Sequence, residues 1–233
     1  MEISTIVLDI CTKGNSEPYK YCGGNNFARE SYNKYKNEMK FISLNDKKII
    51  PLSKLITSCM NKKEMRKNLL NFINNTKNKK NIIIACHTAS SSILDILINN
   101  NFILNNIKIF EPILPTCNYI IEKKYKNILI LSTSFTRRVR WHARILNLNV
   151  KYISFEYLHQ DIENNNINNI NTQLSKLSKH KDFISICDCV VLGCTHYNII
   201  KKDILHHLNK YNFKGEVINS NYVLYNYFSK NNK

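Results

Sequence analysis

The sequence predicts an α/β fold of two similar domains, each with a mostly parallel sheet flanked by helices, and an active site in the cleft between them. Apolar runs of strand length alternate with segments of helical spacing, which is typical of βαβ units. Two units share one pattern: N-I-I-I-A-C-H-T-A-S over 81–90 and C-V-V-L-G-C-T-H-Y over 189–197. Each places an apolar run, a small residue, a cysteine and a threonine before a helical segment. The repeat indicates that each half presents one thiol, Cys86 or Cys194, at the end of a strand.

In the first half of the chain, aliphatic runs predict strands over 3–8, 41–44, 82–85 and 107–110. Apolar residues at helical spacing predict helices over 27–39, 62–74 and 88–98. The helix over 88–98 begins with threonine and serine residues, which can cap it. The Gly-, Asn- and Lys-rich segment 10–26 and the polar segment 46–51 are expected to be loops.

In the second half, the same criteria predict strands over 128–131, 150–155, 189–192 and 216–218. Helices are expected over 115–124, 136–146 and 199–210, with a helical tail at the end. The segment 162–182 is expected to be an Asn-rich loop followed by a helix. We expect a first domain of residues 1–104 plus 205–233, carrying Cys86, and a second domain of residues 105–204, carrying Cys194.

The composition is that of a globular protein with a real core. Of the 233 residues, 43% are hydrophobic, and no apolar run is long enough to span a membrane. The N-terminus lacks the basic region and cleavage site of a signal peptide. Eight cysteines at irregular spacing indicate reduced thiols rather than a disulfide framework. The expected location is therefore the cytoplasm.

The formal net charge of +17 raises the question of a nucleic-acid partner. Lysine greatly outnumbers arginine and is scattered along the chain, which indicates a composition bias rather than a binding face. The tight arginine cluster lies in R-R-V-R-W-H-A-R over 137–144. The sequence does not favour a nucleic-acid partner, and a solvated helix face, or anion contacts near Thr133 and Thr136, explains the cluster more simply. A non-catalytic protein that docks nucleic acid through this segment remains an alternative.

Chemically useful side chains fall at the ends of five predicted strands. These residues are Asp9, Cys86, Glu111, Thr133 and Cys194. Ligands of parallel α/β sheets bind beyond the carboxyl ends of the strands. The convergence of these residues on such ends is stronger support for a site than any one of them alone.

Two thiols that face each other across a cleft could take a proton from one face of a carbon and return it on the other. A thiolate is the active form, and a helix N-terminus lowers a thiol pKa, so we expect a lowered pKa at Cys86 and Cys194. Backbone N–H groups with Thr88 and Thr195 could hold a substrate carboxylate. His196 could tune the Cys194 thiol. The simpler alternative is that both cysteines are buried small apolar residues.

A metal site is a second alternative. The run C-x-C-x4-C-x-H contains Cys187, Cys189, Cys194 and His196. A zinc knuckle would require a CxxC pair, and the segment around Cys189 has the pattern of a buried strand. We therefore expect no metal.

These motifs resemble those of a known family. V-L-G-C-T-H-Y over 191–197 is similar to the second cysteine motif of the glutamate racemases, within the aspartate/glutamate racemase superfamily, and A-C-H-T-A-S over 85–90 is similar to the first. F-E-P over 110–112 and S-T-S-F-T over 132–136 resemble further family segments in the same order. Asp46 and Pro51 match the spacing of an aspartate that precedes the family's P-Y-G segment.

The resemblance implies an isomerase that needs no metal and no cofactor, pyridoxal phosphate included. One cysteine would abstract the α-proton of an amino acid, and the other would reprotonate the opposite face. Asp9 would pair with Cys86, and His196 would pair with Cys194. Either Asp161 or Glu163 would assist; the sequence leaves the two open.

The family pattern further implies a set of substrate-binding residues: Pro51, Ser53, His87, Thr88, Thr133, Thr136 and Thr195. It also implies a homodimer that supplies D-glutamate for peptidoglycan, with no membrane partner. The chain departs from the pattern in three places. Asp9 is followed by I-C-T-K-G instead of S-G-x-G-G, P-Y-G has become P-L-S over 51–53, and His87 replaces an asparagine. An aspartate-type or broad-specificity racemase, or a catalytically impaired binding protein, therefore remains an alternative.

Overall fold

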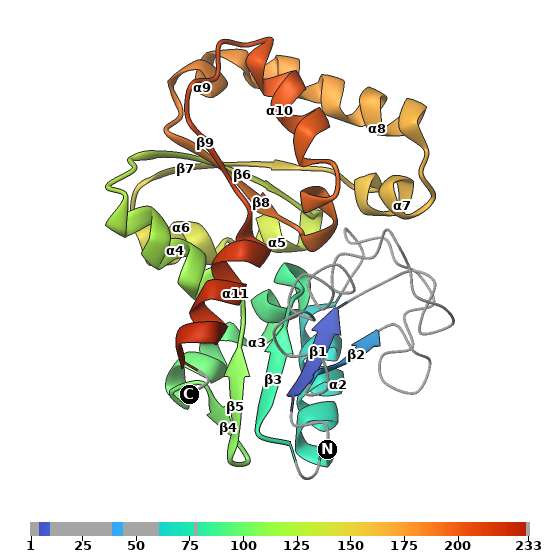
Figure 1. The fold of residues 1–233 in the computed structure, drawn as a ribbon, viewed down its shortest axis with the longest axis vertical. Helices are drawn as coiled ribbons and strands as arrows, with labels where there is room; N and C mark the ends of the chain where they lie inside the picture. The colour runs from blue at the N-terminus through green and yellow to red at the C-terminus, as the bar shows by residue number, and fades with distance from the viewer. Residues whose placement is uncertain (1–4, 10–38, 44–60, 77–78, 232–233) are drawn as a thin grey trace.

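The computed structural model describes residues 5–9, 39–43, 61–76 and 79–231, whose strands form two sheets (Figure 1). The first sheet has the order β2-β1-β3-β5-β4 and the second has the order β7-β6-β8-β9. The first comprises β1 (Thr5–Asp9), β2 (Met39–Ser43), β3 (Asn81–Ile84), β4 (Ile103–Leu104) and β5 (Ile107–Phe110). The second comprises β6 (Asn127–Ser132), β7 (Asn149–Ser154), β8 (Cys189–Gly193) and β9 (Glu216–Ile218).

The first sheet is parallel except for the short β4, which runs antiparallel to β5. Alternate residues of its central strands face opposite sides, as expected for strands. Ile6 and Ile82 point to the side covered by α2 (Lys62–Asn75) and α3 (His87–Asn99). Val7 and Ile83 point to the side covered by α11 (Ser220–Asn231). We call this sheet and its three helices the first lobe.

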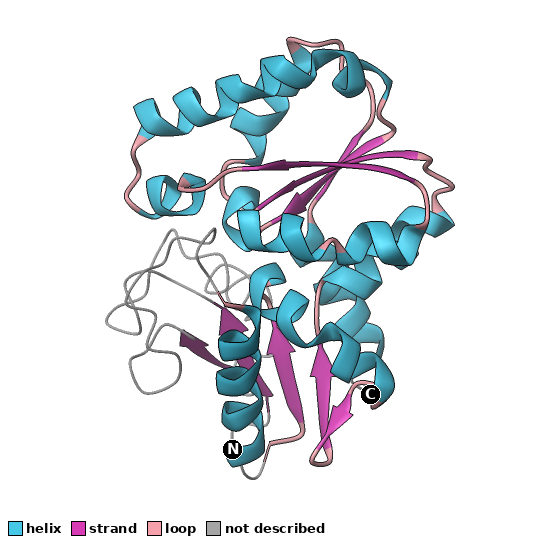
Figure 2. Ribbon diagram, turned by 180° about the vertical axis from the view of Figure 1, so that it is seen from behind, coloured by secondary structure: helices cyan, strands magenta, loops and turns pink. Residues whose placement is uncertain are grey.

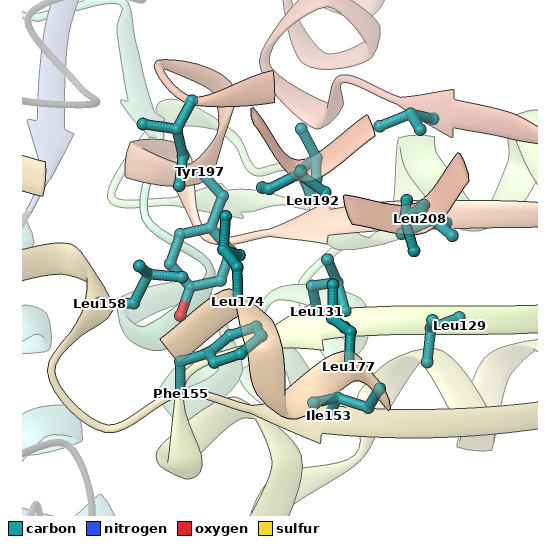
Figure 3. Close-up of a cluster of buried hydrophobic side chains, with 14 of the residues drawn as sticks. Leu129, Leu131, Ile153, Phe155, Leu158, Leu174, Leu177, Leu192, Tyr197 and Leu208 are labelled. Carbon is teal, nitrogen blue, oxygen red and sulfur yellow. The ribbon is translucent and has the colours of Figure 1, made fainter. Parts of the chain in front are cut away.

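The second sheet is parallel throughout, and its central strands β6 and β8 are buried on both faces. One face packs against α7 (Leu158–Glu163), α8 (Ile167–Leu174), η1 (Ser175–His180), α9 (Lys181–Ile186) and α10 (Lys201–Asn209). Leucines from strands and helices interdigitate there, and Phe155 meets Tyr197 edge to face (Figure 3). The opposite face packs against α4 (Ile113–Glu122) and α6 (Trp141–Leu146). We call this sheet and these helices the second lobe.

The chain passes between the lobes at different residues from the predicted domain boundaries. β5 belongs to the first sheet, although residues 107–110 fall within the predicted second domain of 105–204. β9 belongs to the second sheet, although it falls within the predicted segment 205–233. From β9 the chain enters α11, which runs from the second lobe down the face of the first (Figure 1). The crossings between the sheets therefore follow residues 110 and 218.

The predicted α/β class and the predicted strands within the described residues are confirmed, but two segments differ. Residues 136–146 were expected to form one helix, but they form α5 (Ser134–Val139) and α6, because Arg140 adopts a left-handed conformation with φ 59°. The expected loop within 162–182 is largely helical. Its asparagines act locally: Asn165 has φ 53°, and the Asn166 side chain caps α8 by accepting from Asn169 N at 3.2 Å.

The predicted helix over 27–39 and the expected loops over 10–26 and 46–51 lie outside the described residues, apart from Met39 in β2. Among the residues that are described, no helix combines the length and the apolar character that crossing a membrane requires. Seen from the opposite side, α2 and α3 cover the first sheet, while a row of helices lies over the second (Figure 2).

Candidate active site

The two thiols lie at the carboxyl ends of corresponding strands, one in each lobe. Cys86 follows β3 and caps the N-terminus of α3, and Cys194 follows β8 and precedes the short helix η2 (Thr195–Asn198). The small residue before each thiol has a packing reason. A Cβ at Gly193 would lie 2.9 Å from the Leu131 carbonyl oxygen, and Ala85 is completely buried. The shared sequence pattern therefore places both thiols at equivalent positions.

Cys86 lies in a buried and electronegative setting. Its side chain is 6% exposed, and its Sγ accepts a hydrogen bond from Ala89 N at 3.5 Å. Burial raises the pKa of this thiol well above its usual range, the charge of Asp9 raises it further, and the Ala89 N–H only partly opposes them. The predicted lowering of the Cys86 pKa is therefore wrong, because desolvation and a neighbouring carboxylate outweigh the helix N-terminus.

Two buried hydrogen bonds join the lobes beside the thiols. Thr195 Oγ1, next to Cys194, donates to Asp9 Oδ2 of β1 at 2.9 Å. Thr88 Oγ1, two residues after Cys86, lies 2.9 Å from Thr133 Oγ1 at the end of β6. Each thiol segment thus reaches across to the opposite lobe. These contacts bring the predicted site residues of both lobes to one place.

Cys194 heads a chain of hydrogen-bonding groups that ends in a carboxylate. Its Sγ lies 3.8 Å from His196 Nδ1, and His196 Nε2 lies 2.6 Å from Glu163 Oε1 at the end of α7. Both ends of the ion pair are at least nine-tenths buried. Burial by itself would lower the pKa of His196, but the hydrogen bonds and charges of Cys194 and Glu163 outweigh it and raise that pKa well above its usual range.

The structure distinguishes the two carboxylates that the sequence left open. Glu163 contacts His196, whereas Asp161 accepts hydrogen bonds from Asn169 Nδ2 at 3.1 Å and from Gln173 Nε2 on α8. Asp161 therefore joins α7 to α8, and Glu163 is the carboxylate of the Cys194 side.

Thr133 and Thr136 form the polar start of α5. Thr133 caps this helix by accepting from Thr136 N at 3.3 Å, and its Oγ1 lies 3.1 Å from Thr136 Oγ1. At the end of β5, the Glu111 carboxylate accepts hydrogen bonds from Ile113 N and Leu114 N, both at 2.7 Å, and so caps α4. Burial raises the pKa of Glu111 to about 7, although these N–H groups oppose the shift. Glu111 therefore stabilises the start of α4, at the carboxyl end of β5.

His87 packs against a residue that the sequence did not single out. Its ring lies 5.8 Å from the ring of His142 on α6, at an interplanar angle of 20°. All four ring nitrogens of the pair are buried, and none has a hydrogen-bond partner among the described residues. Burial lowers the pKa of His142 to about 4 and also lowers that of His87. The role of His87 in holding substrate stays a prediction, as do those of Pro51 and Ser53, which lie outside the described residues.

Because both imidazoles are buried in neutral form, acid should destabilise the fold. A lowered folded-state pKa means that the stability is present above the unfolded value of 6.5 and is lost as the pH falls towards about 4. Through His142 alone we expect a loss of about 3 kcal/mol between about pH 7 and pH 4. His142→Phe should flatten this dependence, measured by urea unfolding at several pH values. His206→Gln, at an exposed histidine, should leave it unchanged; an identical pH slope in wild type and His142→Phe contradicts the assignment.

The cysteines of the C-x-C-x4-C-x-H run do not converge. Cys187 and Cys194 pack in the core on one face of the second sheet, and Cys189 packs on the other. Among the described residues, no group of three or more His, Cys, Asp or Glu side chains is arranged to hold a metal ion.

The geometry provides two sulfurs from opposite lobes, each beside its own ionisable partner. Asp9 forms a hydrogen bond with Cys86, and its negative charge disfavours the Cys86 thiolate. The charge of Cys194 also raises the Cys86 pKa, so the two thiols interact electrostatically. His142 is the residue of this region that the sequence reasoning missed. The sequence does contain this histidine, within the arginine-rich segment 137–144, but nothing in that segment indicates that it packs against His87 of α3.

No family model matches the chain. The chain is similar in sequence to a glutamate racemase of Fusobacterium nucleatum subsp. nucleatum, with 36% identity over 138 residues. The match covers 54% of this chain and 49% of that protein, so it spans about half the length of the curated relative.

Solved structures are similar over nearly the whole chain. A glutamate racemase isoform of Bacillus anthracis has a TM-score of 0.75 at 21% identity, covering 97% of this chain and 80% of that one. A glutamate racemase of Francisella tularensis in complex with D-glutamate has a TM-score of 0.71 at 19% identity, covering 99% and 82%. An aspartate racemase of Picrophilus torridus has a TM-score of 0.64 at 16% identity, covering 99% and 94%. These likenesses confirm the predicted fold, and the sequence match confirms the resemblance to the glutamate racemases.

Proposed function

We propose that this chain is an amino-acid racemase that works without a cofactor and interconverts L- and D-glutamate. The observation that carries the proposal is the pairing of two thiols from opposite lobes, each with its own ionisable partner. Asp9 serves Cys86, and the His196–Glu163 pair serves Cys194. A two-base racemase needs one acid–base group on each face of the reacting carbon.

The proposed reaction has two steps, and one proton moves in each. A thiolate takes the α-proton, the electron pair left on the α-carbon delocalises into the substrate carboxyl group, and the opposite thiol gives its proton to the other face. The enzyme then holds its thiolate on the second cysteine. Cys86 acts on one enantiomer and Cys194 on the other. Asp9 and His196 carry the protons that reset the two sulfurs.

The substrate carboxylate has suitable donors at this edge of the sheets. The threonine hydroxyls of both lobes and the N–H groups at the start of α3 are neutral donors, and together they can hold an anion. Thr88 and Thr195 exchange their hydrogen bonds within the protein for bonds to substrate. We assign them, with Thr133 and Thr136, to substrate binding.

Glutamate is the preferred substrate because the sequence relative is named a glutamate racemase. The histidine after Cys194-Thr195 also favours the glutamate type, since the family resemblance implies a glutamate at that place in aspartate racemases. The alternative is aspartate, since an aspartate racemase has the same fold. The remaining roles follow from the preferred assignment: D-glutamate for peptidoglycan, a cytoplasmic location and a homodimer.

The test is α-proton exchange in D2O with reductant and no added cofactor. L- and D-glutamate, both aspartates and a panel of other amino acids are incubated separately, and deuterium at Cα and optical rotation are followed together. We expect exchange with loss of optical purity for glutamate, and none for the Cys86→Ala/Cys194→Ala double variant. Turnover of aspartate alone assigns the alternative. Exchange that survives in the double variant, or the absence of exchange with every amino acid, overturns the proposal.

A further inference from the structure

The arginines of this chain are concentrated in a way that its lysine-rich composition does not explain. Four of its six arginines lie within residues 137–144. The longer segment 123–155 carries eight lysines and arginines and no aspartate or glutamate. A general bias towards lysine would scatter positive charge and leave acidic residues among it. This segment is instead a local block of positive charge.

The structure places two of these arginines against β7, the edge strand of the second sheet. Arg137 donates from Nη1 to Ser154 Oγ at 3.3 Å, near the end of the strand. The Arg140 guanidinium lies 6.0 Å from the ring centre of Tyr152, two residues earlier on the same face of the strand. All four arginines, including Arg138 and Arg144, are exposed. We call these four residues the arginine edge.

Three of the four guanidinium groups rest on aromatic rings. Arg138 lies 5.7 Å from the ring centre of Phe135, Arg144 lies 5.2 Å from that of Trp141, and Arg140 rests on Tyr152. Such stacking restricts the conformations of these exposed side chains. Less conformational entropy is lost when a restricted guanidinium binds a phosphate, so the arginine edge is preorganised for anions.

Further positive charge borders the arginine edge. Lys62 Nζ lies 6.0 Å from the ring centre of Trp141, the ring that Arg144 also contacts. Around the nearby His180, burial and the charges of Lys151, Arg137 and Lys179 lower the pKa of its imidazole. The positive field therefore extends from α2 of the first lobe across β7 to η1 of the second.

We propose that the arginine edge binds the phosphate backbone of nucleic acid. The phosphate backbone is a polyanion with closely spaced charges that four exposed guanidinium groups within eight residues can bind together, because a guanidinium can bind a phosphate through two N–H bonds. A lipid surface fits less well, because the apolar side chains Phe135, Val139 and Leu146 of α5 and α6 face the core. This binding is independent of the proposed racemase activity.

The test measures binding of fluorescently labelled single-stranded RNA and double-stranded DNA, each about ten to twenty nucleotides long, by anisotropy at several salt concentrations. The variant replaces all four arginines (R137Q, R138Q, R140Q and R144Q). We expect its affinity to fall at least about tenfold, and the slope of log Kd against log salt to fall by about 2 to 3. The comparison of the two probes tells which nucleic acid binds.

A matched control removes the same charge elsewhere: K202Q, K210Q, K214Q and K230Q, at exposed lysines of α10, the segment after it and α11. It should change the affinity by less than about twofold. Circular dichroism and thermal unfolding show that both variants fold, and both should keep the wild-type racemase activity. Equal weakening in both variants, no binding by the wild type, or binding to anionic phospholipid vesicles in preference to either nucleic acid overturns the proposal.

Discussion

Cys86→Ala and Cys194→Ala are each expected to lose racemisation by about a thousandfold or more, yet to keep one-sided proton exchange with solvent. Each variant retains one sulfur on one face of the α-carbon. That sulfur can still remove the α-proton of the enantiomer that presents its proton to it, and then return a deuteron to the same face. The product keeps its configuration but carries deuterium. The two variants should therefore label opposite enantiomers.

The measurement is deuterium incorporation into L- and D-glutamate in parallel, with chirality checked on the same samples. Cys187→Ala is the matched control, because this cysteine is also buried but packs in the core of the second lobe. It should racemise at nearly the wild-type rate. If both thiol variants label the same enantiomer, one base serves both faces and the two-thiol arrangement is wrong.

The second large effect is expected from Glu163→Gln, which removes the carboxylate of a buried ion pair. Its 2.6 Å contact raises the pKa of His196, so His196 loses its charge at lower pH in the variant. Turnover that begins at Cys194 should fall by about a hundredfold, because the imidazolium beside the sulfur stabilises the thiolate. Turnover that begins at Cys86 should fall less. Turnover numbers at saturating L- and D-glutamate measure this asymmetry, because the equilibrium constant of a racemisation is one and kcat/KM must stay equal in the two directions.

The same substitution should lower the free energy of unfolding by about 2 to 3 kcal/mol. A raised histidine pKa contributes stability that is complete below the unfolded value of 6.5 and is lost as the pH rises through the folded value. The deficit of Glu163→Gln should therefore be largest near about pH 6 and shrink in alkali. Asp161→Asn, on the same helix, is the control and should leave the kinetic asymmetry unchanged. Equal losses of kcat in both directions would contradict the assignment of Glu163 to the Cys194 side.

The sequence was sufficient for the fold because the local signals agreed with one another. The buried strands at 82–85 and 189–192 are continuous apolar runs, and each is followed by a thiol, a hydroxyl and a helical segment. Those signals need no long-range information. The same short range explains why the break at Arg140 was not foreseen, since a left-handed arginine has no distinctive sequence pattern and depends on the packing of α5 and α6.

The parts of the site that the sequence did not give depend on contacts between distant residues. The strand ends were predicted, but not that Thr195 would bond to Asp9 or Thr88 to Thr133. The choice of Glu163 over Asp161 required the direction of α7, and the raised pKa of Cys86 required the depth of its burial. The stacking of His87 on His142 likewise joins two helices far apart in the chain.

The two threonine bridges between the lobes have a kinetic consequence. They hold the two lobes together beside Cys86 and Cys194, which are only 6% and 7% exposed. We therefore expect substrate to reach the sulfurs only when the lobes separate, and product to leave only when they separate again. Such collective motions take microseconds to milliseconds and are slowed by friction with the solvent. Added viscogen should therefore slow turnover, while the isotope effect of an α-deuterated substrate should diminish.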